Sequence, residues 1–442
     1  MIDQDLHRRA TTPYRAATSN IYRCADGKFF QTHGSFNPDP VLDLLGLPHD
    51  IDVASPEEAW TRFQKAISQI NSADLLHAIE NARQAGHKSN SFEEYTNSEH
   101  GKNNTHVGLF ELHHIPNVKQ LPSWWPSTNG TSSSRPLTGL KVVDLTRVIA
   151  GPTVTRGLAE LGASVMRVIS PNIPDWVALH IDLNWGKWNT YLALENERDR
   201  QQLRRLIQEA DVVVNGYRPG AFDKYGFSQE NIIELVANRK RGIVYVRENT
   251  YGWHGPFKHR PGWQPTSDAC AGISHGYGKA LGLDDDEPAM TLFPNSDYST
   301  GLAGVSAILS AILQRGEKGG SYSIDLALNY YNQWLIRSCG VYPQPVWNEM
   351  WEKYDKFQFR AINPMEVSAP ITMKLMHERS DSFRDEFFEV RHNGILGVDI
   401  RCVKPVIQFP NGEVVLKYNV GCRGNGTDAP RWPEDLMTEK VT

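Results

Sequence analysis

The sequence predicts an α/β protein in which an open, parallel-rich, Rossmann-like sheet is accompanied by a smaller α+β domain. After residue 136, short apolar runs alternate with amphipathic helical segments, which is the pattern of βαβ units in a parallel sheet. Before residue 121, a short hairpin-like segment is followed by a longer helical stretch. A stretch rich in Pro, Ser, Thr, Gly and Asn separates the two patterns.

These patterns divide the chain into four predicted segments. Residues 1–120 form the small α+β domain. Residues 121–136, LPSWWPSTNGTSSSRP, form a linker, because this composition buries little surface and favours no regular element. Residues 137–345 form the large α/β domain. Residues 346–442 are rich in Pro and Trp and have weak periodicity, and we expect them to be an extension that packs on the large domain.

In the small domain, a hairpin precedes a helical region. The segment ADGKFFQTHGSF, residues 25–36, is typical of a short hairpin. The helical stretch runs from Pro56 to Gln84, and Ser55 is its expected N-cap. Its apolar residues recur at helical spacing, so one face of the stretch is expected to be buried.

In the large domain, each predicted strand is an apolar run, as expected for strands that are covered on both faces. The strands are 140–145, 163–169, 211–216, 242–248 and 321–328. The helices between them are 152–161, 198–209 and 301–314. The helix 301–314, GLAGVSAILSAILQ, has small residues and no charge, so we expect it to be buried against the sheet.

Composition excludes several classes of function. A net charge of −5 gives no general attraction to nucleic acid. No run of about 18 apolar residues is present, so a membrane span and a signal peptide are not expected. Five cysteines without a CxxC spacing suggest neither a disulfide framework nor a zinc knuckle. We therefore expect a cytoplasmic protein without metal.

Four motifs resemble the CaiB/BaiF (type III) CoA-transferase family, in that family's order and spacing. The resemblance covers roughly residues 136–342 and is closest to fungal tandem-type members. Its carriers are LTGLKVVDLTRVIAGPTVTRGLAELGASVMRV (137–168), NWGK (184–187), ADVVVNGYRPGAFDKYGF (210–227) and NSDYSTGLAGVSAIL (295–309). Each motif alone is weak, whereas four in sequence are specific. The small domain here precedes the large one, as it does across the internal junction of those tandem proteins.

Asp297 is the candidate catalytic residue. Local sequence alone favours an N-cap or turn role, because Asp297 lies shortly before the predicted helix 301–314. The resemblance implies instead that this carboxylate attacks an acyl-CoA thioester and forms an aspartyl anhydride and then an aspartyl-CoA thioester. A thiolate is a good leaving group, so a carboxylate can carry out this attack.

Further site residues follow from both kinds of argument. A flexible Gly followed by Pro at a helix start exposes backbone N–H groups to an anion, which makes Ala150 and Gly151 candidates for CoA binding. For Lys187 a solvated surface position is the alternative to a phosphate contact. The resemblance implies CoA contacts by Lys187, Tyr217, Lys224 and Tyr225, and substrate contacts by Tyr251, Trp263 and Gln264.

Several positions depart from the family pattern. Ile169, Ser170 and Pro171 stand where the family commonly has Glu and Arg, and Trp188 replaces an Arg. The glycine-rich loop that closes over the site in some family transferases has no evident counterpart here. These differences bear mainly on recognition of adenine and phosphate.

Three functions are compatible with the sequence. The first is CoA transfer between an acyl-CoA and a carboxylic acid, with coenzyme A as substrate, no permanently bound cofactor and assembly as a homodimer, as the resemblance implies. The second is a 2-methylacyl-CoA racemase or isomerase, although Trp263 and Gln264 occupy the places of that enzyme's His and Asp. His259 and His275 are the nearby substitutes. The third is a non-catalytic acyl-CoA-binding protein.

Overall fold

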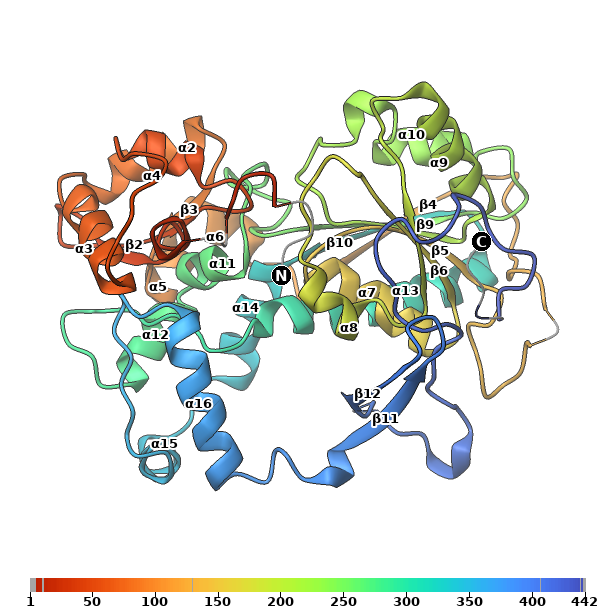
Figure 1. Cartoon of the computed structure of the whole chain (residues 1–442). Coiled ribbons are helices and arrows are strands. Elements are labelled where there is room, and N and C mark those ends of the chain that lie inside the picture. The colour runs from red at the N-terminus through yellow and green to blue at the C-terminus, as the bar shows by residue number, and fades with distance from the viewer. Residues whose placement is uncertain (1–4, 10–11, 129, 406, 438, 440–442) are drawn as a thin grey trace.

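Seven strands form the main sheet, in the order β4-β10-β9-β8-β5-β6-β7, and all neighbours are parallel except β4 and β10 (Figure 1). The computed structural model describes residues 5–9, 12–128, 130–405, 407–437 and 439. The strands are β4 (Glu111–Ile115), β5 (Lys141–Leu145), β6 (Ser164–Ile169), β7 (Lys187–Tyr191), β8 (Val212–Asn215), β9 (Val244–Asn249) and β10 (Ser321–Ala327). The predicted α/β class with an open parallel-rich sheet is confirmed.

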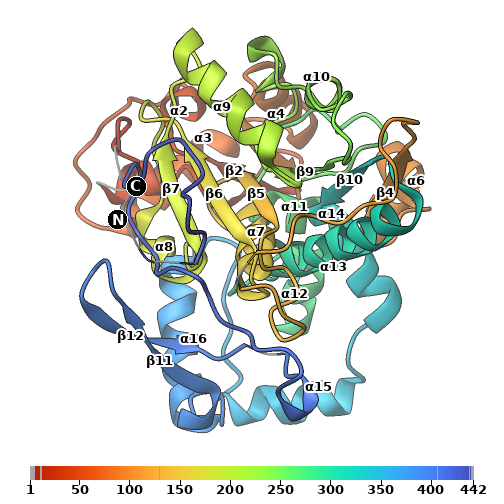
Figure 2. The ribbon, with the colours of Figure 1, turned by 90° about the vertical axis from the view of Figure 1, so that its right-hand side faces the viewer.

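Helices cover both faces of this sheet (Figure 2). On one face α7 (Ala150–Glu160) and α13 (Asn295–Lys318) share an apolar core with β5, β8, β9 and β10. On the other face α9 (Glu197–Glu209) and α10 (Gln229–Leu235) pack on a second core. Helix α13 begins six residues before the predicted start at Gly301, so Asp297 lies in its first turn rather than in a loop.

Close packing of α13 on α7 brings the starts of both helices together. A Cβ atom at Gly301 would stand 2.5 Å from Thr153 Cβ, and one at Gly157 would stand 2.6 Å from Val305 Cγ2. Distances below 3.0 Å are too short for any side chain, so these two glycines permit the approach. The start of α13, which carries Asp297, therefore lies beside the start of α7.

A three-stranded antiparallel sheet lies at the other end of the molecule, among the N-terminal helices. Its strands are β1 (Ile21–Arg23), β2 (Phe29–His33) and β3 (Ala85–Lys88). The hairpin is confirmed, and so is the N-cap, because Ser55 Oγ accepts a hydrogen bond of 3.3 Å from the Glu58 N–H. The helical stretch is divided into α3 (Pro56–Ile67) and α4 (Ser72–Asn81).

The region around this small sheet also contains later parts of the chain. Short helices α1 (Pro13–Ala16), α2 (Asp39–Leu44), α5 (Phe92–Asn97) and α6 (Glu99–Asn104) belong to its N-terminal part. Helices α11 (Gln264–Ala271), α12 (Ile273–Ala280) and α14 (Leu328–Trp334) come from the segment between β9 and residue 342. A further short helix, α8 (His180–Leu183), lies elsewhere, directly before β7. The Asn90 side chain donates a hydrogen bond to the Cys270 carbonyl at 2.9 Å, which joins the two parts.

Strand β4 belongs to the main sheet, although residues 1–120 were assigned to the small domain. It pairs with β10 in antiparallel register, with Glu111 opposite Asp325 and Ile115 opposite Ser321. Its sequence, ELHHI, has two adjacent histidines and no apolar run, because an edge strand is only partly covered. The four-segment division remains a prediction. Strand β4 departs from it, because β4 lies within residues 1–120 but pairs with a strand of the main sheet.

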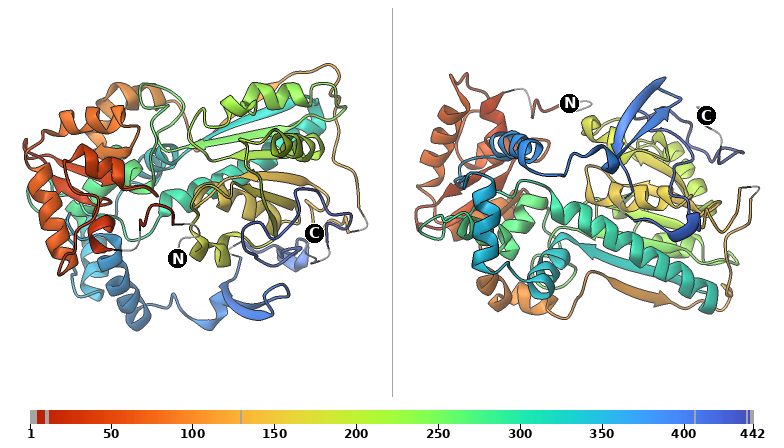
Figure 3. Two further views of the ribbon diagram at one scale, coloured as in Figure 1. Left: turned by 45° about the horizontal axis from the view of Figure 1, so that its top comes forward. Right: turned by 90° about the horizontal axis from the view of Figure 1, so that it is seen from below.

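The segment after residue 345 contacts both ends of the molecule (Figure 3). Helices α15 (Gln344–Lys353) and α16 (Met365–Arg379) lie toward the small sheet, where Ile362 and Val367 pack against the N-terminal core. The strands β11 (Phe388–Asn393) and β12 (Val398–Val403) form a hairpin. Residues after 414 return to the main sheet, and Gly186 N–H donates to the Val420 carbonyl at 2.8 Å. The segment thus packs on the large domain, as predicted, and also on the N-terminal core.

Among the residues that the structure describes, no helix combines the length and apolar character needed to cross a membrane.

Candidate active site

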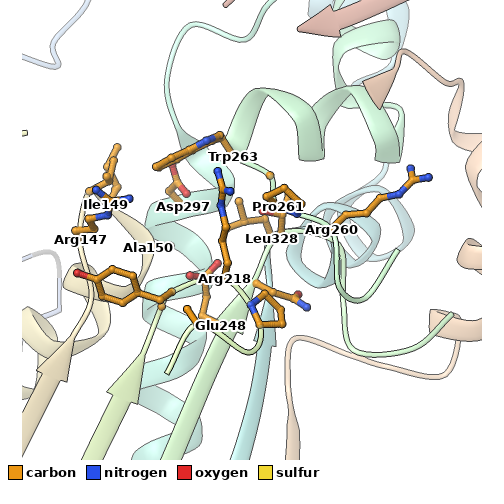
Figure 4. Close-up of a pocket in the computed structure, with 18 residues that line it drawn as sticks. Arg147, Ile149, Ala150, Arg218, Glu248, Arg260, Pro261, Trp263, Asp297 and Leu328 are labelled. Carbon is orange, nitrogen blue, oxygen red and sulfur yellow. The ribbon is translucent and has the colours of Figure 1, made fainter. Parts of the chain in front are cut away.

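Asp297 lies at the junction of two cavities near the carboxyl edge of the main sheet (Figure 4). The first cavity has a volume of about 180 Å³ and is lined by Arg147, Ala150, Tyr217, Glu248, Trp263 and Asp297, among others. The second, also about 180 Å³, opens toward the small sheet and is lined by Phe36, Trp176, Trp263, Met290 and Asp297, among others. Asp297 thus faces the AGP turn, residues 150–152, at the start of α7.

The negative charge of an ionised Asp297 carboxylate has little stabilisation from its surroundings. Burial raises its pKa well above the usual value, and the nearby carboxylates of Glu248 and Asp268 raise it further. Among the described residues, no side chain or backbone group donates a hydrogen bond to this carboxylate. A carboxylate held in this way is costly to ionise, and it is correspondingly basic and reactive once ionised.

Glu248 is the second carboxyl group that lines the first cavity, and it was not among the residues predicted from the sequence. It lies near the carboxyl end of β9, and Figure 4 shows it lining the same pocket as Asp297. Burial raises the pKa of Glu248 to about 7. The signal that could have found it is its position, because ligands of open α/β sheets bind at the carboxyl ends of the strands.

Asp268, on α11, is by contrast a structural anion. Its carboxylate accepts hydrogen bonds from Thr291 Oγ1 at 2.8 Å and Asn332 Nδ2 at 2.9 Å, and also from the Gln264 side-chain amide. Ser296 Oγ is a longer contact at 3.5 Å. These bonds hold the segment before α13 and thereby position the turn that carries Asp297.

The AGP turn brings backbone N–H groups to the first cavity, which Asp297 also lines. Ala150 lines the first cavity, and Gly151 packs so closely on Thr146 that a Cβ atom there would be 2.6 Å from Thr146 Cγ2. Val148 has a φ of 74°, which is strained for a β-branched residue. The N–H groups of the first turn of α7 have no partner within the helix, so they can stabilise negative charge on a substrate oxygen.

Three arginines that were not among the predicted site residues border the first cavity: Arg147, Arg218 and Arg260. The Arg147 guanidinium lies 4.7 Å from the centre of the Phe36 ring and 5.6 Å from that of Tyr217. Its Nη1 donates to the Pro174 carbonyl at 2.7 Å. These groups give the cavity positive charge near the two carboxyl groups.

A third cavity, of about 290 Å³, continues from the first along the carboxyl edge. Tyr217 and Ala221 line both cavities, and Lys224 and Tyr225 line the third. Tyr225 donates a hydrogen bond to Glu195 at 3.1 Å, and Lys224 Nζ lies 4.7 Å from the Tyr225 ring centre. Three of the predicted CoA contacts, Tyr217, Lys224 and Tyr225, are thus brought together with the Asp297 cavity.

The position of Lys187 differs from the expectation. It is the first residue of β7, its side chain is 0% exposed, and Nζ donates to Asp144 Oδ2 and to the Pro152 carbonyl, both at 3.0 Å. Burial lowers the pKa of Lys187 to about 8, with Asp144 opposing that effect. A phosphate has no access to this ammonium group. The prediction that Lys187 contacts CoA is therefore wrong, and the residue forms a buried ion pair with Asp144.

Tyr251 also lies away from the cavities. It is 1% exposed and packs with Tyr95 and Cys270 in a separate apolar cluster. Trp263 and Gln264 do reach the second cavity, where Trp263 stacks on His33 with ring centres 5.4 Å apart. Of the three residues predicted to contact the substrate, Trp263 and Gln264 line the second cavity and Tyr251 does not.

Neither histidine considered for proton transfer lines the Asp297 cavities. His259 is exposed. His275 belongs to α12, and its Nε2 lies 3.2 Å from Asp286 Oδ1. Proton transfer by these two residues is thus not favoured by their positions.

Comparison with known proteins shows the family of this chain. Residues 137–344 match the model of CoA-transferase family III. Acetyl-coenzyme A transferase nodX of Hypoxylon pulicicidum is 49% identical over 99% of this chain and 75% of that protein. An acyl-CoA transferase of Gibberella moniliformis is 32% identical over 94% of this chain and 74% of that protein.

Among solved structures, a CAIB/BAIF family protein from Brucella suis aligns at 22% identity with a TM-score of 0.46, covering 66% of this chain and 96% of that one. This chain spans about three quarters of the two fungal relatives. With relatives of this identity and coverage, the chain belongs to CoA-transferase family III.

Proposed function

We propose that this chain transfers coenzyme A from an acyl-CoA to a carboxylic acid, with Asp297 as the nucleophile. The observation that carries the proposal is the place of Asp297, where two cavities meet and where its carboxylate accepts no hydrogen bond from the described residues. The names of the two fungal relatives, an acetyl-coenzyme A transferase and an acyl-CoA transferase, support the same class of reaction.

The cavities suggest a path for the substrate. The nucleotide half of CoA would occupy the third cavity, near Lys224 and Tyr225, and the pantetheine arm would pass Tyr217 into the first cavity. The thioester would then stand beside Asp297 with its acyl group in the second cavity. Binding of the distant nucleotide would orient the reacting carbonyl, so truncated thioesters should react slowly as well as bind weakly.

The reaction requires no net proton transfer. An Asp297 oxygen attacks the thioester carbonyl carbon, the C–S bond breaks, and the CoA thiolate leaves an acyl-aspartyl anhydride. The thiolate attacks the aspartyl carbonyl carbon and releases the first acid as its carboxylate, which leaves an aspartyl-CoA thioester. The acceptor carboxylate attacks this thioester, and the released thiolate then takes the acceptor acyl group and restores Asp297.

Two features of the site fit these steps. The raised pKa of Asp297 makes its ionised form a stronger nucleophile, although it lowers the ionised fraction at acidic pH. The backbone N–H groups at the start of α7, where Ala150 lines the first cavity with Asp297, are available to stabilise the oxyanion that forms during attack. The chain's own residues therefore supply both the nucleophile and charge stabilisation.

The second cavity suits an acyl group with apolar carbons. Phe36, Trp176, Trp263 and Met290 provide an apolar and aromatic lining. Arg9 and Glu366 stand at the same cavity, so a polar end on the acyl group would find both charges there.

Intact-protein mass spectrometry tests the nucleophile directly. After incubation with an acyl-CoA, we expect a mass increase equal to the acid or to CoA, less one water in each case, and hydroxylamine should remove it. Asp297→Asn should show no adduct, while Asp182→Asn, at a carboxylate outside the cavities, should keep it. An adduct retained on the Asp297→Asn protein would place the nucleophile elsewhere. CoA binding without any adduct or turnover would favour the non-catalytic alternative.

Glu248 favours a second candidate, racemisation at the α-carbon of a 2-methylacyl-CoA. Proton removal and return need two groups, and Glu248, with a pKa of about 7, shares the cavity with Asp297. Incubation with such a thioester in deuterium oxide separates the reactions. The transferase proposal expects CoA exchange without α-deuteration, whereas α-deuteration that is lost in Glu248→Gln would establish the racemase.

Assembly as a homodimer and a cytoplasmic location also remain proposals. Light scattering of the purified chain and imaging of a fluorescent fusion would test them.

A further inference from the structure

Two histidines and a glutamate converge on the molecule's surface, away from the Asp297 cavities. His106 follows α6, Glu111 begins β4, and His254 lies in the connection between β9 and α11. Their ligand atoms all lie within 4.8 Å of one another. His254 Nε2 is 2.9 Å from Glu111 Oε2, and His106 Nε2 is 3.7 Å from Glu111 Oε1.

We propose that His106, Glu111 and His254 bind a Zn²⁺ ion. Zinc takes imidazole nitrogen and carboxylate oxygen as ligands at about 2.0–2.1 Å in tetrahedral geometry, which sets the ligand atoms about 3.3–3.4 Å apart. The separations of 2.9 and 3.7 Å fall on either side of that value. The ligand atoms of His106 and His254 lie within 4.8 Å of each other, so rotation of the two side chains must close that distance by at most about 1.5 Å.

The surroundings support the carboxylate and leave one position open. The buried Tyr330 donates a hydrogen bond from its hydroxyl group to Glu111 Oε2 at 3.1 Å, which is the kind of contact that orients a metal-binding carboxylate. The His254 carbonyl accepts a bond from Asn104 Nδ2 at 3.0 Å and fixes the backbone there. The His106 side chain is 62% exposed, so water can occupy the fourth position.

The neighbouring group of Glu111, His113 and Asp325 is a weaker candidate. Asp325 already accepts two hydrogen bonds from Arg247, at 2.6 and 2.8 Å, so its oxygens are committed to that cation. His113 Nε2 remains 3.7 Å from Asp325.

A zinc ion here would join three separate segments of the chain. His254 lies six residues before Arg260 in the connection that continues to Trp263, and both of those residues line the first cavity. Zinc would hold this connection against β4 and α6. We therefore expect it to stabilise the wall of the cavity without entering the chemistry, and this expectation does not depend on the proposed reaction.

Isothermal titration calorimetry with ZnCl₂, on tag-free protein treated with a chelator, tests the site. We expect one Zn²⁺ per chain with a micromolar or tighter Kd, and a rise in Tm on addition of zinc. Glu111→Gln and the double variant His106→Ala/His254→Ala should weaken binding at least about 100-fold, because each removes a ligand. His392→Ala, in another exposed His–Asp pair, is the matched control and should bind as the parent does.

Cobalt substitution supplies a second readout. Tetrahedral Co²⁺ should give visible absorption bands in the parent chain that are absent from Glu111→Gln, and Tm without metal shows whether each variant is folded. Zinc binding that survives the double variant, or no binding up to 100 μM ZnCl₂, would overturn the proposal. So would loss of binding in His113→Ala with binding retained in His106→Ala, since that would place the metal at the neighbouring group.

Discussion

Two carboxylates, the buried Asp144 and the half-buried Asp297, lie at the same edge of the main sheet in opposite environments. Asp144, on β5, accepts hydrogen bonds from Thr155 Oγ1 at 2.6 Å and Lys187 Nζ at 3.0 Å, and from Thr146. Asp297 accepts none from the described residues and faces Glu248 instead. The first arrangement stabilises the fold, whereas the second maintains a reactive group at the expense of stability.

The largest expected effect is the loss of transfer activity in Asp297→Asn. Removal of the nucleophile should lower kcat by about 10³-fold or more, measured as exchange of labelled CoA into acyl-CoA. The variant should be at least as stable as the parent at neutral pH, because a group whose pKa is raised on folding costs stability once it is ionised. A variant that is both inactive and much less stable would give Asp297 a structural role.

The reverse pattern is expected for Lys187→Met. This change leaves Asp144 buried without its cation and should lower the free energy of unfolding by about 3–5 kcal/mol, measured by urea denaturation. The KM for CoA of the folded fraction should stay unchanged. An unaltered stability together with a raised KM would restore Lys187 as a CoA contact and remove the contrast between the two sites.

A smaller effect, on pH dependence, is expected for Glu248→Gln. Transfer needs ionised Asp297, so activity rises with pH through the pKa of that group. Ionised Glu248 raises this pKa, and the variant should therefore move the acidic limb of kcat/KM to lower pH by about one unit. A limb that stays in place would show that the two carboxyl groups do not interact.

The stability of Glu248→Gln gives an independent check. In the parent, Glu248 has a folded pKa of about 7 against an ordinary value of 4.5. Its raised pKa contributes stability below pH 4.5, and this contribution is lost as pH rises through 7. Relative to the parent, the variant should therefore gain up to about 3 kcal/mol between pH 4.5 and 8, measured by thermal or urea unfolding.

The smallest effect is expected for Lys224→Ala at the third cavity. Loss of one solvent-exposed cation near a phosphate should raise the KM for acyl-CoA about 2- to 5-fold, with kcat unchanged, and the difference should shrink at high salt. Lys240→Ala, a lysine that lines none of the three cavities, is the control. Equal KM values for both variants would place the nucleotide outside the third cavity.

Part of the candidate site could be predicted because it depends on local motifs. The AGP turn and Asp297 stand at helix starts, and their motifs identified them before their contacts were known. The burial of Lys187 could not be predicted, because its partners, Asp144 and the Pro152 carbonyl, stand 43 and 35 residues earlier in the chain. Arg147 lies within the first motif and Glu248 ends a predicted strand, but nothing in the local sequence shows that either side chain faces a cavity.

The sequence by itself determined the βαβ alternation, the open sheet and the position of Asp297 close to a buried helix, since these depend on periodicity and on residues adjacent in the chain. Tertiary structure alone decided which charges are compensated. The partners of Asp144, the approach of Glu248 to Asp297 and the convergence of His106, Glu111 and His254 each join residues from separate elements. Local sequence carries no record of such long-range contacts, because burial and charge pairing arise only when distant segments pack.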